Sequence, residues 1–426
     1  MSSEFRLGGG GGGFSIGAER LYGLSTMNSG DTAWVLISAA LVLFMTPGLA
    51  FFYGGMVRSK NVLGMLMQNF FAIGIVSILW AMIGFSIAFG GTGPLIGNTE
   101  FAWLANVATL DGNIPGLAFV AFQMMFAVIT PALITGATAD RLKFGAYALL
   151  IAIWSILVYA PVARWVFNPN GWIYQMGALD FAGGAAIHIN AGVAALAVVL
   201  VIGNRRGHGS EPMPPHNLPF TMLGTGILWF GWMGFNAGSA LAADGVAAQA
   251  VVNTQLAAAA GMLGWLLVER IKRGHATTLG AASGAVAGLV AVTPCAGFVG
   301  GASPMIIGAV AGAGCFAALG IKERMDWDDS LDVIAVHLVG GIIGTLLLGF
   351  FADSAVNGDT DGLFFGGGAE LLKDQFVAAA AVGAFSFTVT LGIAVVISKT
   401  MGLRVSEDDE LRGLDQTQHA EAAYSS

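Results

Sequence analysis

Two histidines, His188 and His337, lie inside long apolar stretches, and each is followed four residues later by a glycine, Gly192 and Gly341. Of the six histidines in the chain, only these two fall within such a stretch. An imidazole changes its charge near a pKa of about 6.5, so two facing histidines could pass a proton or select a small solute. This pair is the first candidate for chemistry.

Two other interpretations of the histidines stay open. Each imidazole could instead form a hydrogen bond across a helix interface, as polar side chains do in apolar bundles. A metal site is less favoured, because no third ligand lies at a suitable spacing from either histidine. We therefore expect no metal and no other cofactor.

Carboxylates precede both histidines. Asp180 stands eight residues before His188, and Asp332 stands five residues before His337. A carboxylate at the start of a helix caps free backbone N–H groups and interacts favourably with the helix dipole. The same charge could attract a cation to an outer vestibule. The sequence predicts one or both roles for Asp180, with Asp332 as its inner counterpart.

Aromatic residues form a third pattern. Phe122 and Phe126 are four apart, and Trp232 and Phe235 are three apart, so each pair shares one face of a helix. Aromatic residues near a membrane surface usually serve packing or anchoring. Together with a hydroxyl and a carboxylate, however, they could form a cation–π cage for an ammonium-type cation. The candidate cage comprises Phe126, Phe167, Asp180, Trp232, Phe235 and Ser239.

The composition shows what must hold these residues. The chain has 426 residues, of which 56% are hydrophobic and only 10% charged, and its mean hydropathy is +0.75. Soluble domains usually carry roughly 25% charged residues, so the sequence indicates an all-α integral membrane protein. The net charge of −8 owes much to an acidic tail, residues 407–410, and no basic patch suggests a nucleic-acid partner.

Hydrophobic runs predict eleven membrane-spanning helices, because each run approaches the roughly 20 residues that a bilayer requires. Lysines and arginines follow every odd-numbered run and are nearly absent from the other loops, which places the N-terminus outside and the C-terminus inside. The histidine-bearing runs are five apart, which predicts an inverted five-plus-five repeat followed by helix 11. The expected helices are 33–56, 64–90, 116–139, 144–166, 184–203, 218–240, 247–269, 277–293, 304–320, 331–352 and 374–399.

The chain divides into three expected regions. Residues 1–26 contain a run of six glycines and are typical of a flexible leader, either native or added for expression. Residues 27–400 form the transmembrane domain, and residues 401–426 form a cytoplasmic regulatory tail.

Seven stretches, which cover nearly the whole chain from about Met27 onward, carry a family resemblance. By these motifs the chain resembles the ammonium transporter family (Amt/MEP/Rh), on its Amt/MEP branch. The stretches are PGLAFFYGGMVRSKNVL from Pro47, FQMMFAVITPALITGA from Phe122, GALDFAGGAAIHINAG from Gly177, PHNLPFTMLGTGILWFGWMGFNAGSA from Pro215, GAVAGLVAVTP from Gly284, DVIAVHLVGGIIG from Asp332 and GLDQTQHAEAAY from Gly413.

The resemblance implies a homotrimer in the inner or plasma membrane, with eleven helices and one pore in each subunit. It implies that His188 and His337 are the pore pair and Asp180 the essential carboxylate, and that Thr293 lies along the path. The residues that it assigns to the external ammonium site are Trp232, Phe235 and Ser239, and those at the gate are Phe122 and Phe126, with Phe126 stacked on Phe235.

The chain departs from the family pattern at two positions. Phe167 stands where the family often has a tryptophan of the external cage, so cation recruitment is weaker unless Trp165 or Trp172 substitutes. Ala420 follows His419, where the tail motif normally has glycine. That tail resembles the segment that couples subunits and docks the PII signalling protein, so the substitution bears on PII regulation.

We expect a transporter rather than an enzyme. The implied mechanism recruits NH4+ or methylammonium at the outer cage, deprotonates it and conducts NH3 past His188 and His337, with or without separate proton transfer. An ammonium sensor or transceptor is one alternative, which is disfavoured because only about 27 residues follow the last helix. A Rh-like channel for neutral gas is another, and Ser239 and Trp232 argue against it.

Overall fold

The structure, a computed structural model, describes residues 27–110, 112–358 and 360–424. Within these ranges the fold is all-α, and the only β-contact is an isolated antiparallel bridge between Leu142 and Arg404. The expected fold class is therefore confirmed at this level. The glycine-rich leader expected over residues 1–26 lies outside the described residues.

Ten helical segments in the described chain are long and apolar enough to cross a membrane. A further apolar helix, α12, has 15 residues, fewer than a usual span, so the count of eleven crossings stays a prediction. The elements are α2 (Ser29–Met56), η1–α3–η2–α4 (Ser59–Phe89), α5–η5 (Gly116–Gly136), α6–η6–α7 (Phe144–Phe167), α8 (Trp172–Met176), η7–α9 (Gly184–Ile202), α10–η8 (Leu218–Ala240), α11 (Gly245–Arg273), α12 (Thr278–Val292), α13 (Ser303–Met325), η9–α14 (Ile334–Phe351), α15 (Glu370–Thr400), α16 (Glu407–Arg412) and α17 (Leu414–His419).

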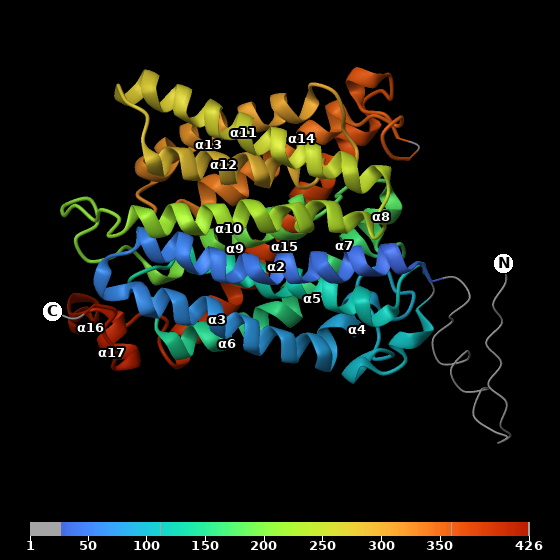
Figure 1. The fold of residues 1–426 in the computed structure, drawn as a ribbon. Helices are drawn as coiled ribbons and strands as arrows, with labels where there is room; N and C mark the ends of the chain where they lie inside the picture. Colours follow the sequence, from blue (N-terminus) through green and yellow to red (C-terminus); the bar gives the residue numbers. More distant parts are fainter. Residues whose placement is uncertain (1–26, 111, 359, 425–426) are drawn as a thin grey trace, which may run out of the picture.

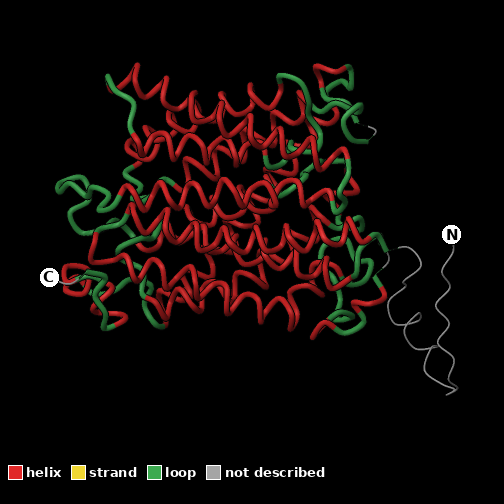
Figure 2. The backbone as a smooth tube through the Cα atoms, viewed as in Figure 1, coloured by secondary structure: helices red, strands yellow, loops and turns green. Residues whose placement is uncertain are grey.

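The long helices lie side by side in one bundle, and the loops gather at its two ends (Figures 1 and 2). α2 and α10 pack against each other along the middle of the bundle. α16 and α17 lie at one end, which we call the tail face; the other end is the far face. Large apolar side chains cover the sides of the bundle: Phe230, Leu263 and Phe376 are 60%, 62% and 62% exposed. A lipid environment accounts for such exposure.

Two helices carry the histidines, and each begins with a π-helical turn. His188 lies on η7, which continues into α9, and His337 lies on η9, which continues into α14. A π turn holds one extra residue and often occurs at functional sites. Here the turns bring both imidazoles to the place where the two helices meet.

Glycines allow these two helices to cross at close range. Gly192 packs directly on the backbone of Leu338, the residue after one histidine. Gly341 packs on Ile189, the residue after the other. The contacts are reciprocal, as an inverted repeat would produce. The spacing of four residues from histidine to glycine thus reflects a helix crossing, in which small residues let the backbones approach.

We predict that Gly192→Ala destabilises the fold. A methyl group at this position would overlap the backbone of Leu338, and such overpacking costs about 1 to 3 kcal/mol. The thermal unfolding temperature of the purified protein in detergent should therefore fall. Gly226→Ala is the matched control, because nothing lies within 4 Å of a methyl group there. Equal unfolding temperatures for the two variants would contradict the crossing as the constraint.

Ion pairs join the loops at the tail face. Arg58 pairs with Asp140 at 2.8 Å, and Arg205 pairs with Asp140 at 3.4 Å and with Asp328 at 2.8 Å. Burial alone would raise the pKa of Asp328, but hydrogen bonds from Arg205 and the charges of Arg205 and Arg141 hold that pKa below its usual value. Four loops that the sequence predicts on one side therefore do meet, and buried charges hold them together.

The C-terminal tail packs on the same face through backbone hydrogen bonds. The Leu414 N–H donates to the Asn61 side-chain oxygen at 2.8 Å, and the Gly64 N–H donates to an Asp415 carboxylate oxygen at 2.8 Å. These bonds join α17 to the start of α3. The tail is thus part of the folded structure and is held against the loop between α2 and α3.

Ala420, where the family motif normally has glycine, ends α17 in the left-handed conformation at φ +57°. A side chain in this conformation costs roughly 1 to 2 kcal/mol, whereas glycine adopts it freely. We predict that Ala420→Gly stabilises the docked tail by about 1 kcal/mol and slows proteolysis of residues 401–424 about fivefold. Ala422→Gly, at an exposed position without positive φ, is the control and should give no protection. Faster cleavage of the Ala420→Gly tail would contradict this explanation.

Candidate functional site

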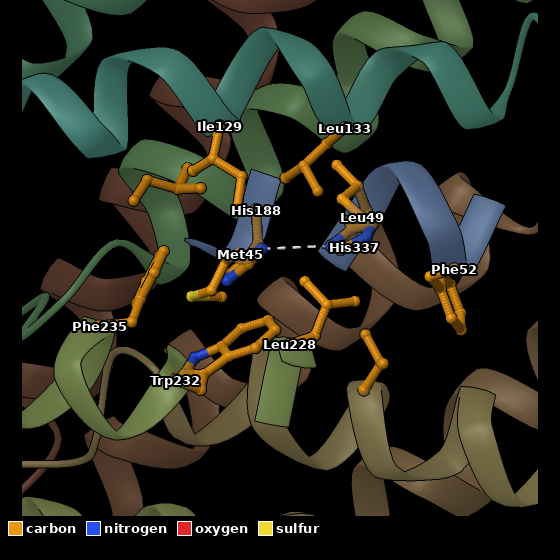
Figure 3. A pocket seen from close by; sticks show the side chains of 12 residues that line it. Met45, Leu49, Phe52, Ile129, Leu133, His188, Leu228, Trp232, Phe235 and His337 are labelled. Carbon is orange, nitrogen blue, oxygen red and sulfur yellow. Dashed lines mark hydrogen bonds between the residues drawn. The ribbon is translucent and has the colours of Figure 1, made fainter. Parts of the chain in front are cut away.

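His188 and His337 face each other at the centre of the bundle (Figure 3). Their Nδ1 atoms are 3.2 Å apart, and their ring planes are inclined by 16°. The two residues are 1% and 3% exposed. The structure thus brings together two side chains that are 149 residues apart in the sequence, as the pair interpretation predicts.

The contact between the two Nδ1 atoms fixes what the pair offers to a solute. One Nδ1 must donate and the other accept, so in a neutral pair one ring presents Nε2 as an acceptor and the other presents Nε2–H as a donor. The Nε2 of His188 has no hydrogen-bond partner among the described residues. A small molecule that both donates and accepts hydrogen bonds matches this arrangement. In the described part of the chain, no group of three or more His, Cys, Asp or Glu residues is placed to hold a metal.

The histidines line a narrow cavity, which we call the histidine pocket. Its volume of about 10 Å³ is close to what one water-sized molecule needs. The other lining residues are apolar or aromatic, and an ion that gives up its hydration there meets a large free-energy cost. They are Met45, Leu49, Phe52, Ile129, Leu133, Ile187, Leu228, Trp232, Phe235 and Val286.

Trp232 lies against His188 in this pocket. The two rings are stacked at 5.5 Å with a tilt of 20°. The indole N–H of Trp232 donates to the Thr293 hydroxyl at 2.9 Å, and that hydroxyl donates to the Leu289 carbonyl at 2.8 Å. Thr293 lies behind the tryptophan and fixes its orientation, and it does not line the pocket itself.

Two phenyl rings separate this pocket from a larger cavity. Phe126 and Phe235 meet edge to face, with centroids 4.6 Å apart. Phe235 lines the histidine pocket, and Phe126 lines the larger cavity. Phe122 packs on Phe126 at 4.8 Å and is fully buried behind it. We call Phe126 and Phe235 the phenyl partition.

The larger cavity, the vestibule, has a volume of about 840 Å³ and lies between the loops of the far face. Four of the predicted binding residues line it together: Phe126, Phe167, Asp180 and Ser239. The other two, Trp232 and Phe235, line the histidine pocket instead. The Ser239 hydroxyl donates to the Phe235 carbonyl at 2.9 Å, which leaves its oxygen lone pairs free to accept. A hydrated cation can enter a space of this size.

No tryptophan takes the place of Phe167 in the described lining of the vestibule. The Trp165 indole N–H donates to the Leu95 carbonyl at 2.7 Å, and its ring packs on Trp172 at 5.8 Å and on Phe385 at 4.6 Å. Both tryptophans therefore serve packing. Phe167 supplies the vestibule with a phenyl face, which is a weaker cation–π partner than an indole.

Asp180 caps the start of η7. Its two carboxylate oxygens accept four backbone N–H groups at 2.6 to 3.1 Å, from Gly183, Gly184, Ala185 and Ala186. Burial raises the pKa of this carboxyl above its ordinary value, while the four N–H groups favour the ionised form. The capping role predicted for Asp180 is therefore present, and the residue also borders the vestibule.

The structural counterpart of Asp180 is Asp329, so the prediction of Asp332 was wrong. Asp329 accepts the backbone N–H groups of Val333 at 3.1 Å and of Ile334 at 2.7 Å, where η9 begins. Asp332 instead adopts φ +63° and pairs with Lys322. Burial raises the pKa of Asp329 to about 6, against the opposing charge of Lys322. The missed signal was the spacing, because Asp329 precedes its histidine by eight residues, as Asp180 does.

A family model described as Ammonium Transporter Family matches residues 33–424. This chain belongs to the ammonium transporter family. The ammonium transporter of Mycobacterium tuberculosis (strain H37Rv) is 51% identical over 431 aligned residues, which cover 93% of this chain and 90% of the relative. The ammonium transporter of Bacillus subtilis is 49% identical, with coverage of 93% and 99%.

Solved structures agree with this ammonium transporter assignment. The crystal structure of Candida albicans Mep2 has a TM-score of 0.86 at 35% identity and covers 90% of this chain and 88% of its own. A structure described as a sensor Amt protein has a TM-score of 0.86 at 30% identity, with coverage of 92% and 98%. Ten helices in the described residues are long and apolar enough to span a membrane, and the relatives are transporters, so the chain is a multi-pass membrane protein.

We predict that Asp180→Asn lowers the stability of this ammonium transporter by about 1 to 3 kcal/mol. The amide keeps one acceptor oxygen but turns an NH2 group toward backbone N–H groups, which then stay unsatisfied. Thermal unfolding in detergent should show the loss. Asp332→Asn is the control, because its partly exposed pair with Lys322 is worth about 0 to 1 kcal/mol. Similar unfolding temperatures for both variants would argue against the capping role.

Proposed function

We propose that the vestibule recruits NH4+ from outside the cell, that the ion loses its proton at the phenyl partition, and that NH3 crosses the histidine pocket. The observation that carries the proposal is the contrast between two cavities. The vestibule of about 840 Å³ has room for a hydrated cation, whereas the pocket of about 10 Å³ admits one small neutral molecule. Between them stand Phe126 and Phe235.

The histidine pair suits the neutral form of the substrate. Ammonia donates and accepts hydrogen bonds, so it can use the Nε2 donor and the Nε2 acceptor that the pair presents. An ion in the same place would lose its hydration against an apolar lining. Because the pocket favours NH3 over NH4+, the ion gives its proton to water in the vestibule before the solute enters.

The charges at the two ends support an orientation for this path. The basic loops that contain Arg58, Arg141 and Arg205 meet at the tail face, and loops with excess positive charge usually stay in the cytoplasm. The tail face is therefore cytoplasmic in our proposal, and the vestibule opens outside the inner or plasma membrane. We extend the proposal to a homotrimer whose tail receives a PII-type protein.

We predict that the double variant His188→Ala, His337→Ala loses ammonium and methylammonium uptake down to the background of membranes without the protein, or passes ions in its place. Both outcomes result from the loss of the two imidazoles, which offer their Nε2 groups to a solute in an otherwise apolar and aromatic lining. Uptake into proteoliposomes is the measurement. His275→Ala, at an exposed position, is the matched control and should transport normally. Unchanged uptake in the double variant would contradict the proposed path through the histidine pocket.

A sensor is the second candidate, because one structural neighbour is described as a sensor Amt protein. In that case ammonium would bind in the vestibule and act on the tail without crossing. An ammonium pulse on protein-containing membranes separates the two functions. Uptake, with or without a sustained current, indicates transport, whereas a brief charge displacement that does not depend on the lipid-to-protein ratio and comes without uptake indicates binding alone.

A further inference from the structure

Polar side chains in the vestibule wall differ in whether the protein already satisfies them. The Asn168 amide donates to the Ala88 carbonyl at 3.2 Å, and its oxygen accepts the Asn170 N–H at 2.8 Å. The carboxylate of Asp180 is occupied by four backbone N–H groups. These residues shape the cavity, but their hydrogen bonds are directed into the protein.

Gln123 is different. It lines the vestibule and is only 9% exposed, yet its side-chain oxygen has no hydrogen-bond partner among the described residues. A buried carbonyl oxygen without a donor is unfavourable, because water no longer satisfies it. The residue lines the vestibule, but this oxygen is itself buried from it. A half-turn of the amide about its last side-chain bond, which has two broad minima, turns the oxygen to a ligand that donates hydrogen bonds.

The helix that carries Gln123 sets its depth in the vestibule. Phe119, Gln123 and Phe126 all line the cavity, and their spacing of four and three residues forms one stripe along α5. With a rise of about 1.5 Å per residue, Gln123 stands about 4.5 Å along the helix axis from Phe126. The amide therefore lies one turn above the phenyl partition, between two aromatic rings.

We propose that Gln123 is a direct ligand of the ammonium ion in the vestibule, and that its side-chain oxygen accepts an N–H bond from the ion beside the Phe126 ring. The Ser239 oxygen supplies a second acceptor, because its own hydrogen is bonded to the Phe235 carbonyl. This inference rests on the proposed function and adds a residue to its recruitment step. Phe167 attracts the cation less strongly than a tryptophan would, and the hydrogen bond to Gln123 makes up part of that loss.

The chemistry of the site favours ammonium over an alkali cation. Ammonium carries four directed N–H donors, so in our proposal it donates to the Gln123 and Ser239 oxygens while it lies on a phenyl face. A potassium ion has no donor to direct and instead needs a shell of several oxygens. Gln123 thus helps the vestibule to select ammonium over potassium before the solute reaches the phenyl partition.

Gln123→Met tests the proposal, since methionine keeps the length of the side chain and removes the acceptor. We expect the ammonium concentration for half-maximal uptake to rise about tenfold, which corresponds to about 1.4 kcal/mol. The maximal rate should stay within about twofold, because the partition and the histidine pocket are unchanged. Gln123→Glu keeps an oxygen acceptor and adds negative charge, so its half-maximal concentration should equal or fall below that of the wild type.

Gln68→Met is the matched control. Gln68 is also buried, at 5% exposure, and its side-chain oxygen also lacks a partner among the described residues, but it lies on α3 and does not line the vestibule. Its variant should keep the wild-type half-maximal concentration. A general effect of removing a buried amide would appear in both variants, and the proposed ligand role only in Gln123→Met.

The readouts are ammonium uptake into proteoliposomes and the ammonium-induced charge movement on supported membranes, each recorded over a range of ammonium concentrations together with the amount of inserted protein. Wild-type half-saturation in Gln123→Met overturns the proposal. If that variant fails to insert, Gln123→Glu decides, and a half-maximal concentration raised tenfold there overturns it. A wild-type protein that gives brief charge displacement and no uptake refutes transport, but its half-saturation still reports the contribution of Gln123 to binding.

Discussion

The reciprocal helix crossing at Gly192 and Gly341 is the constraint on which the centre of the molecule depends. At each glycine, the partner helix occupies the space that a side chain would fill. The two histidine-bearing turns therefore cannot slide past each other without a clash. Asp180 and Asp329 fix the starts of the same helices through backbone N–H groups. With both ends and the crossing set, the Nδ1 atoms of the histidines meet at 3.2 Å.

The same scaffold separates two electrostatic environments over a short path. On one side of the phenyl partition, the vestibule offers volume, hydroxyl and amide oxygens and the field of Asp180. On the other side, the pocket offers two imidazoles in an apolar wall. The proposed function assigns the collection of the cation to the first environment and the selection of the solute to the second.

Much of this architecture could be predicted from the sequence. The long apolar runs indicate the helices, and the few ionisable residues inside them, such as the two histidines, indicate the site. The spans could be located because lysine, arginine, proline and glycine interrupt the hydrophobic runs where helices end, and His188 could be paired with His337. Asp329 was missed because Asp332 is also a carboxylate before the helix, and only backbone geometry shows which one caps. The sequence also did not predict which cavity the aromatic residues line. The spacing of Trp232 and Phe235 places them on one helix face, but it does not show on which side of the phenyl partition that face lies.

The distance in sequence between the two paired histidines has a consequence for biosynthesis. His188 enters the membrane 149 residues before His337. At about 5 to 20 residues per second, the first imidazole and the groove beside Gly192 wait on the order of ten seconds for the helix that completes them. During that interval the first half must shield a polar ring from lipid by temporary contacts of its own. A nascent chain paused before His337 therefore exposes a polar ring that the finished fold buries.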